Sequence, residues 1–219
     1  MDFSFLSTTK LFRGISTEDI KAMLVCLDFK ADKYEKGQII HRTGETIDSI
    51  GMVVSGGVNI EHNDYWGNRA IISHVSPGQI FGETYACLTG QPLLVDAVAS
   101  EQTEVLAMNV GRVIRSCSNS CEHHAVLIRN LLTISSHKNL LLSQRMFHTS
   151  FKSMRAKLMS YFSEQAQQAG SSCFTVPFNR QQLADYLNVD RSAMCNEISK
   201  MKKDGVILVE KNTFTMLAV

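Results

Sequence analysis

The sequence lacks the features that are typical of flexible linkers, membrane-spanning proteins and secreted proteins. It holds only 3 prolines and 13 glycines in 219 residues, which argues against long flexible linkers. No run approaches the roughly 18 consecutive apolar residues of a membrane-spanning helix, and the N-terminus lacks the basic and then apolar stretches of a secretory signal. Hydrophobic residues at 44% and charged residues at 20% are typical of a globular chain. We therefore expect a soluble cytoplasmic protein without a membrane partner, built from one domain and a smaller second one.

Catalytic motifs are also missing. The chain contains no GxGxxG or GxxxxGK phosphate loop, and its serines, histidines and aspartates lack a nucleophile-elbow setting. No residue can be named for an enzymatic step, so we predict that the protein is not an enzyme.

The six cysteines form no clear metal or disulfide pattern. In a cytoplasmic chain with an ample core, reduced thiols are the better expectation. Cys117 and Cys121, with His123 and His124 nearby, offer ligand types that zinc accepts, but their spacing differs from the usual C-x2-C pairs. We predict no metal site, and a thiol or metal redox sensor stays open as an alternative.

The net charge of +1 conceals an uneven distribution. Residues 149–219 hold 9 Lys and Arg against 6 Asp and Glu, whereas residues 1–148 hold 13 against 15. The basic excess of the smaller C-terminal part is compatible with an anionic partner, although a solvated surface gives the same count.

Between about residues 29 and 109 the hydrophobic period is two. Ile50, Met52 and Val54 alternate along the chain, and turn signals such as Gly56-Gly57 and Pro77-Gly78 recur at short intervals. Many short strands at regular turn spacing predict an all-β barrel or sandwich.

The segment from 122 to 148 contains neither proline nor glycine and has apolar residues at three- and four-residue steps, which predicts one long helix. It carries two apolar stripes, so one can pack on the β domain and the other on a second chain. We prefer this dimer to a single broad buried face, because Leu127, Ile134 and Leu141 keep a seven-residue spacing. The predicted dimer residues are Leu127, Leu131, Ile134, Lys138 and Leu141, and the other stripe holds Ala125, Val126, Leu132, Leu140 and Phe147.

The strongest functional signal lies between residues 179 and 205. Residues 181–187 predict one short helix, residues 188–190 a break, and Asp190 a good N-cap for a second helix. Met194, Ile198 and Met201 share one face of that helix, and the opposite face is polar and ends in lysines.

A polar helix of this kind suits the DNA major groove, which is about 12 Å wide and admits one α-helix. Arg191 could bond guanine bidentately, Asn196 could bond adenine, and Gln181 at the start of the first helix could bond phosphate. An ordinary helical hairpin would share the basic face, but the turn, the terminal hairpin and the dimer helix fit one DNA-binding design. The candidate DNA-binding residues are Arg180, Gln181, Gln182, Arg191, Ser192, Cys195, Asn196 and Lys200.

In order and spacing, several fragments resemble the CRP/FNR family, the cyclic-AMP-receptor-type bacterial transcription regulators. The resemblance covers nearly the whole length and implies an α+β fold. Its parts would be an N-terminal cyclic-nucleotide-binding-like β-roll (a double-stranded jelly roll) that senses an effector over residues 1–121, a dimerisation helix over 122–148 and a winged helix-turn-helix over 149–219. The family also implies a homodimer on twofold-related double-stranded DNA, with RNA polymerase as a further partner. The fragments are Tyr34–Ile40, Gly44-Glu45, Val54–Val58, Pro77–Glu83, Gln181–Leu187, Arg191-Ser192 and Gly205–Ile207.

One departure from the family bears on its effector. In the cyclic-nucleotide binders a Gly-Glu pair is followed by Arg-Ser, in which Arg holds the cyclic phosphate and Glu a ribose hydroxyl. Here Gly82 and Glu83 are present, but Leu93 and Leu94 stand at the later positions. A buried phosphate without its Arg costs several kcal/mol, so we expect the cassette fold without cyclic AMP binding.

The effector therefore stays unidentified. The predicted pocket comprises Gly82, Glu83, Thr84, Leu93 and Leu94, and an apolar wall beside one carboxylate favours a small molecule with an apolar body and a hydroxyl or amine. No cysteine precedes Cys26, so the cysteine cluster of the family's iron–sulfur branch is missing and that cofactor is not expected. A cyclic-nucleotide-binding regulatory module for another protein is a further alternative, which the missing Arg and the winged helix disfavour.

Overall fold

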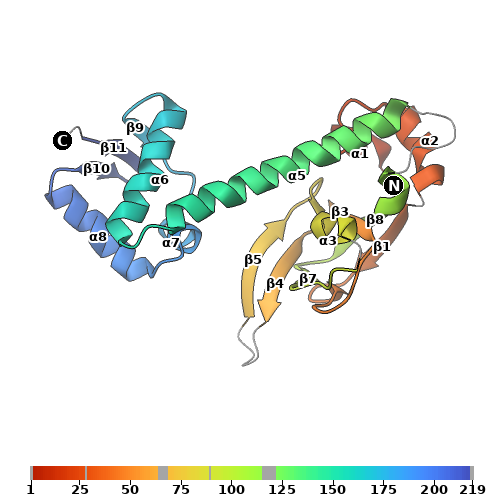
Figure 1. The fold of residues 1–219 in the computed structure, drawn as a ribbon, viewed down its shortest axis with the longest axis horizontal. Helices are drawn as coiled ribbons and strands as arrows, with labels where there is room; N and C mark the ends of the chain where they lie inside the picture. The colour runs from red at the N-terminus through yellow and green to blue at the C-terminus, as the bar shows by residue number, and fades with distance from the viewer. Residues whose placement is uncertain (1, 28, 64–68, 89, 115–121, 218–219) are drawn as a thin grey trace. The chain divides into compact units, whose positions relative to one another are not determined.

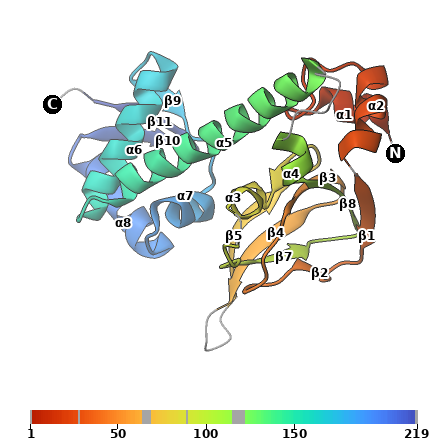
Figure 2. The same ribbon diagram turned by 45° about the vertical axis from the view of Figure 1, so that its right-hand side comes forward.

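The computed structural model describes residues 2–27, 29–63, 69–88, 90–114 and 122–217 (Figures 1 and 2). The chain divides into two units, Met1–His137 and Lys138–Val219. The division falls inside the long helix α5 (Glu122–Thr149), so this helix contributes residues to both units. None of the helices in the described ranges is long and apolar enough to cross a membrane.

The first unit opens with two helices whose starts follow from local capping. Asp2 caps α1 (Phe3–Thr8), accepting hydrogen bonds from the backbone N–H groups of Ser4 and Phe5. At α2 (Thr17–Leu27) the Ser16 hydroxyl oxygen accepts a bond of 3.2 Å from the N–H of Asp19, the position that the sequence predicts for an N-cap.

Two antiparallel sheets follow in the described residues of this unit, as the period-two pattern predicts. Inward side chains of both sheets, among them Val53, Phe81, Val58 and Val75, form a small core between them. The opposite side of β3 supplies Ile50 and Met52 to a larger core with α1, α2 and α5. The first sheet has the order β1 (Lys30–Tyr34), β8 (Thr103–Asn109), β3 (Ser49–Ser55), β6 (Ile80–Phe81), and the second the order β2 (Ile39–His41), β7 (Asp96–Ala99), β4 (Val58–Asn63), β5 (Arg69–Val75).

Two short helices, α3 (Glu83–Cys87) and α4 (Val110–Ile114), complete this unit before α5. The double-sheet architecture agrees with the predicted β-roll.

The first turns of α5 are buried against their own chain, which changes the predicted dimer stripe. Leu127 is 0% and Leu131 6% exposed, both within the larger core, and Ile134 packs against that core. The Asn130 side chain fastens this face by donating to the carbonyl oxygens of Leu11 and Arg13, at 2.9 and 2.8 Å. Leu127 and Leu131 therefore belong to the core of their own chain, and the dimer contact predicted for them stays a prediction.

The other predicted stripe of α5 is the one that faces outward. Leu132 is 62%, Leu140 55% and Phe147 60% exposed. Of the remaining predicted dimer residues, Lys138 is half-buried and Leu141 is 50% exposed. The two predicted stripes of α5 thus differ in exposure over its described residues.

The second unit is built on an aromatic core. Phe162 and Phe214 have ring centroids 4.5 Å apart, with Phe174 packed beside both. Ser153 caps the start of α6, and Gly170 ends it in the left-handed conformation that a residue with a Cβ rarely adopts. Its elements are α6 (Met154–Ala169), β9 (Cys173–Thr175), α7 (Arg180–Leu187), α8 (Arg191–Lys203), β10 (Ile207–Glu210) and β11 (Thr213–Met216), with the sheet order β10-β11-β9.

Candidate functional site

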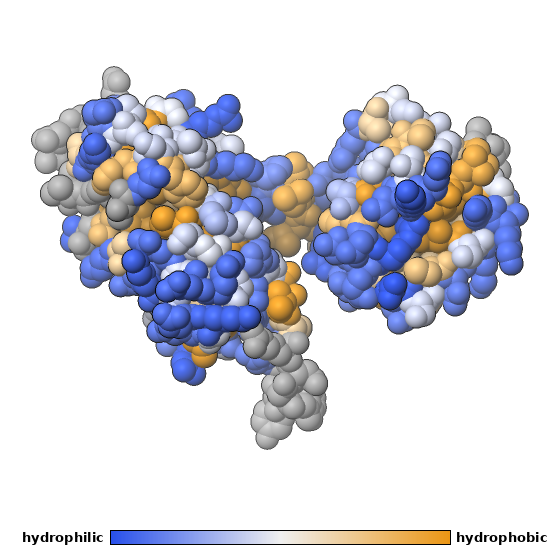
Figure 3. All heavy atoms as spheres, turned by 180° about the vertical axis from the view of Figure 1, so that it is seen from behind, coloured by the Kyte–Doolittle hydropathy of each residue, from blue (hydrophilic) through white to orange (hydrophobic). Residues whose placement is uncertain are grey.

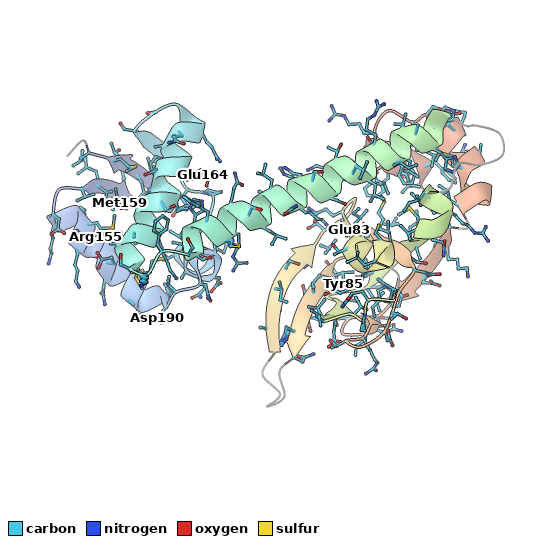
Figure 4. The ribbon with its side chains drawn as sticks, in the orientation of Figure 1. Glu83, Tyr85, Arg155, Met159, Glu164 and Asp190 are labelled. Atoms are coloured by element: carbon cyan, nitrogen blue, oxygen red, sulfur yellow. The ribbon has the colours of Figure 1, made fainter. Side chains whose placement is uncertain are left out.

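The helix-turn-helix is formed by α7, a three-residue turn and α8. Asn188 ends α7 with φ of 52°, and its backbone N–H bonds back to the carbonyl oxygens of Ala184 and Asp185. Asp190 then caps α8, its carboxylate accepting from the N–H of Ala193 at 2.7 Å (Figure 4). The cap satisfies a backbone donor that would otherwise lack a partner, so the first turn of α8 is held in helical geometry.

The two faces of α8 separate as the sequence predicts. Met194 and Met201 are fully buried and Ile198 is 6% exposed, so this face fixes the helix to the aromatic core. Ser192, Asn196 and Lys200 follow the opposite side, and they and Arg191, the first residue of the helix, are all exposed. Cys195 is half-buried against the core, so less of this side chain is available to a ligand than of its neighbours.

A carboxylate–guanidinium cluster connects α8 to α6. Arg155 on α6 bonds Glu197 at 2.7 Å and Asp204 at 2.5 Å, both at or just beyond the C-terminal half of α8 (Figure 4). These bonds raise the pKa of Arg155. Sequence reasoning did not single out this arginine, because its partners are more than 40 residues away along the chain.

Three predicted DNA contacts on α7 have partners within the chain. The Gln182 side-chain oxygen accepts from the N–H of Asn179, completing a capping box. Arg180 donates to the carbonyl oxygen of Lys211 at 3.0 Å, and its guanidinium lies 4.9 Å from the centre of the Phe214 ring. Gln181 bonds Asp185 at 2.8 Å on an exposed surface. Arg180 therefore ties the start of α7 to the turn between β10 and β11.

The predicted effector residues gather around α3. Gly82 precedes α3 with φ of 78°, and an added Cβ would lie 2.9 Å from the Ile47 side chain. Glu83, the first residue of α3, is 7% exposed, whereas Thr84 is exposed. The Tyr85 hydroxyl accepts from the N–H of Leu94 at 3.4 Å and so connects α3 to the segment that would hold a phosphate (Figure 4).

The two leucines of that segment point in different directions. Leu93 is 4% exposed and Leu94 is 64% exposed. The backbone of Leu93 exchanges two bonds of 2.8 Å with Gly44 and Glu45. The path of the cassette is therefore maintained by the backbone, while an apolar side chain fills the buried position.

The cassette segment itself is acidic, while the charge of Arg42, outside it, also acts on Asp96. Residues 82–99 contain no lysine or arginine, and they include the buried Glu83. Asp96 accepts bonds of 2.6 Å from the Thr43 N–H and the Asn63 amide, and these bonds, the first above all, lower its pKa. A phosphate diester would meet carboxylates here and no guanidinium from this segment.

The cysteine and histidine motif falls mostly outside the described residues, since Cys117 and Cys121 lie there. Within the described ranges no three His, Cys, Asp or Glu side chains gather as metal ligands would. His123 pairs with Asp19 at 3.1 Å, and His124 is buried. Cys87, Cys173 and Cys195 are free thiols.

Two protein families match the chain. The cyclic nucleotide-binding domain matches residues 31–120, and the Crp-like helix-turn-helix domain matches residues 156–218. The fold and these matches define a transcription regulator with an N-terminal cyclic nucleotide-binding domain and a C-terminal DNA-binding helix-turn-helix. The chain belongs to the CRP/FNR family, as the sequence resemblance indicates.

Individual relatives are distant. The chain is similar to the cyclic AMP receptor protein of Thermus thermophilus, with 23% identity over 210 residues, 93% of this chain and 90% of the relative. Among solved structures, the Catabolite Activator Protein of Thermus thermophilus is 20% identical, with a TM-score of 0.51 and coverage of 95% and 94%. The c-di-GMP responsive global regulator CLP of Xanthomonas campestris is 16% identical, with a TM-score of 0.55 and coverage of 93% and 100%. At these identities the structural likeness shows the fold.

The cap at Asp190 yields the first prediction. We expect Asp190→Ala to lower the free energy of unfolding by about 1 kcal/mol, because the first turn of α8 loses its side-chain acceptor. Asp190→Ser retains an acceptor and should stay within a few tenths of a kcal/mol of the parent. Urea unfolding followed by circular dichroism measures both, and equal losses in the two variants would show that the cap contributes nothing.

Proposed function

We propose that this regulator binds a twofold-related DNA site as a homodimer and reads its sequence with the exposed face of α8. The observation that carries the proposal is the pairing of a capped, core-anchored helix with the exposed Arg191 at its start and an outward row of Ser192, Asn196 and Lys200. Side chains at the N-terminal end of such a helix meet base edges in the major groove. Lysines at its other end meet the phosphates, which set affinity and register.

The roles along α8 follow from side-chain chemistry. Arg191 stands at the first helical position and can bond two acceptors of guanine with its planar fork. Asn196 can bond adenine with its amide in the same manner. Lys200, Lys202 and Lys203 supply positive charge in the last turn. Arg180 and Gln182 bond backbone groups within the chain, which suits them to shaping the motif, whereas Gln181, whose amide bonds the exposed Asp185 carboxylate, is proposed to exchange that bond for one to a phosphate.

Dimerisation is best supported by the exposed side of α5. Leu132, Leu140 and Phe147 lie on one helical face, and the neighbouring Met146 is 68% exposed. Monomeric proteins rarely leave a row of large apolar side chains in water. Figure 3 shows hydrophobic atoms at the surface of this helix. We assign the dimer contact to this stripe, which the β domain leaves uncovered.

The effector is proposed to be a small molecule other than cyclic AMP. The cyclic nucleotide-binding domain supplies the fold of the pocket, but the segment that should hold the phosphate presents Leu93 and Leu94. With Glu83 buried beside it, the pocket suits an uncharged or cationic ligand that has an apolar body.

The DNA proposal is tested with a site selected from random duplexes by the parent protein. Arg191→Ala should weaken binding to that site by about 1–3 kcal/mol, roughly 5- to 150-fold, and relax the preference at one base pair of each half-site. Arg129→Ala, which removes an exposed arginine of α5, should leave the affinity unchanged. Fluorescence anisotropy measures both, and affinity should fall steeply with salt. A parent protein without any selectable site would contradict the proposal.

The dimer assignment is tested by placing a carboxylate on the exposed stripe. Leu140→Glu should produce monomers in sedimentation velocity without a change in circular dichroism, because the side chain is exposed within one chain but would be buried without a partner in the dimer. Leu208→Glu makes the same change at a similarly exposed leucine of β10 and should leave the dimer intact. If Leu140→Glu formed dimers as stable as those of the parent, the dimer contact would have to lie on another surface.

The effector proposal is tested by calorimetry with cyclic AMP and cyclic GMP. We expect no binding heat at micromolar ligand and no rise in the midpoint of thermal unfolding, because a desolvated phosphate would lack a cation from residues 82–99. Micromolar affinity for either nucleotide would show that residues outside this segment replace the missing arginine.

A further inference from the structure

The C-terminal end of α5 is fastened by polar contacts to α7 of the helix-turn-helix and to α6, which packs behind it. All the residues involved belong to the second unit. The contacts come from Gln144, Arg145 and His148, which lie in the last two turns of α5. Neither the major-groove assignment of α8 nor the exposed stripe of α5 accounts for them.

Arg145 binds the end of α7. Its Nε donates to the carbonyl oxygen of Tyr186 at 2.9 Å and its Nη2 to that of Asp185 at 2.8 Å. The guanidinium also lies 5.8 Å from the centre of the Tyr186 ring. Carbonyls in the last turn of a helix lack intrahelical donors and carry the negative end of its dipole. One arginine therefore supplies a donor to the Tyr186 carbonyl and a second donor to that of Asp185, which also accepts from the Asn188 N–H, next to the turn that leads into α8.

His148 binds α6. It is 2% exposed, its Nδ1 lies 2.9 Å from the Ser160 hydroxyl oxygen, and its Nε2 is hydrogen bonded to Glu164 (Figure 4). Gln144 donates to the other carboxylate oxygen of Glu164 at 2.7 Å. The His148 ring also lies against Tyr161, with centroids 5.6 Å apart, and burial raises the pKa of that tyrosine.

Apolar packing between the two helices is incomplete at this point. A groove of about 780 Å³ lies between the end of α5 and α6, with Phe147, Phe151 and Met159 among its lining residues. The chain between the helices is short, residues 150–153. Beside this groove, the polar bonds to Glu164, Ser160 and the α7 carbonyls, together with the packing of His148 on Tyr161 and Tyr186, orient α6 and α7 on α5.

We infer that Arg145 and His148 are positioning residues that fix the helix-turn-helix to the end of α5, so that α8 follows the direction of α5. This inference rests on the proposed DNA-binding function. In a dimer joined through α5, two recognition helices must enter grooves about 34 Å apart. If the helix-turn-helix turned freely about residues 150–153, the dimer would bind half-sites at many spacings, each of them weakly. A fixed helix-turn-helix binds half-sites at one spacing tightly.

The test measures how affinity depends on the spacing of the two half-sites. Duplexes carry the selected half-sites at the preferred spacing and at spacings one or two base pairs longer or shorter. The parent should prefer one spacing by about tenfold or more, because a fixed pair of helices gains effective concentration only there. In Arg145→Met this ratio should fall to about twofold, while affinity for a duplex with a single half-site stays at the parent value. Arg145→Lys, which keeps the charge but not the fork, should lie between them.

Controls separate positioning from general destabilisation. Arg129→Met makes the same change in the first unit and should retain the spacing preference. His148→Phe keeps a buried ring but removes both polar bonds to α6, so it should also flatten the preference, which covers the case in which Arg145→Met does not fold. A folded Arg145→Met and His148→Phe with the parent's spacing ratio would overturn the inference. So would a parallel loss of single half-site affinity with an unchanged ratio, since that result indicates a merely structural role. If the parent itself selects no DNA, the proposed function fails first.

Discussion

The structure depends on the way in which the apolar surface of α5 is divided. A 28-residue helix with two apolar stripes cannot bury both against one small β domain. The stripe that contains Leu127 and Leu131 is covered within the chain, and Asn130 fixes that choice with two bonds to backbone carbonyls. The remaining stripe is left in water, so the covering of one face creates the surface on which a second chain is proposed to pack.

The same helix supplies the second unit with contacts of a different kind. Its last turns meet α6 and α7 through an arginine, a histidine and a glutamine in place of leucines. Charge-assisted bonds of this type are directional, so they fix an angle in a way that apolar contact does not. A regulator that presents two recognition helices at one separation needs such a fixed angle more than it needs additional stability.

The cassette keeps its backbone path without the arginine that holds the phosphate in the cyclic-nucleotide binders. Gly82 retains the left-handed backbone that starts α3, and Leu93 retains its two backbone bonds to residues 44 and 45. Neither interaction uses the side chain that would hold a phosphate. Substitution at residues 93 and 94 can therefore change the ligand while the backbone path persists, which is consistent with an effector of different charge on a familiar frame.

The sequence by itself determined the local features of this protein. Period-two alternation identified the sheets, Ser16 and Asp190 identified helix starts, and the faces of α8 followed from a spacing of three and four residues, because each of these depends on neighbours within one or two turns. Only the tertiary structure decided which stripe of α5 is buried, that Arg180 bonds the Lys211 carbonyl, and that Arg145, His148 and Arg155 hold other helices. Those contacts join residues that lie far apart along the chain, or they depend on which surface another domain covers. The pattern of residues along one element predicts neither.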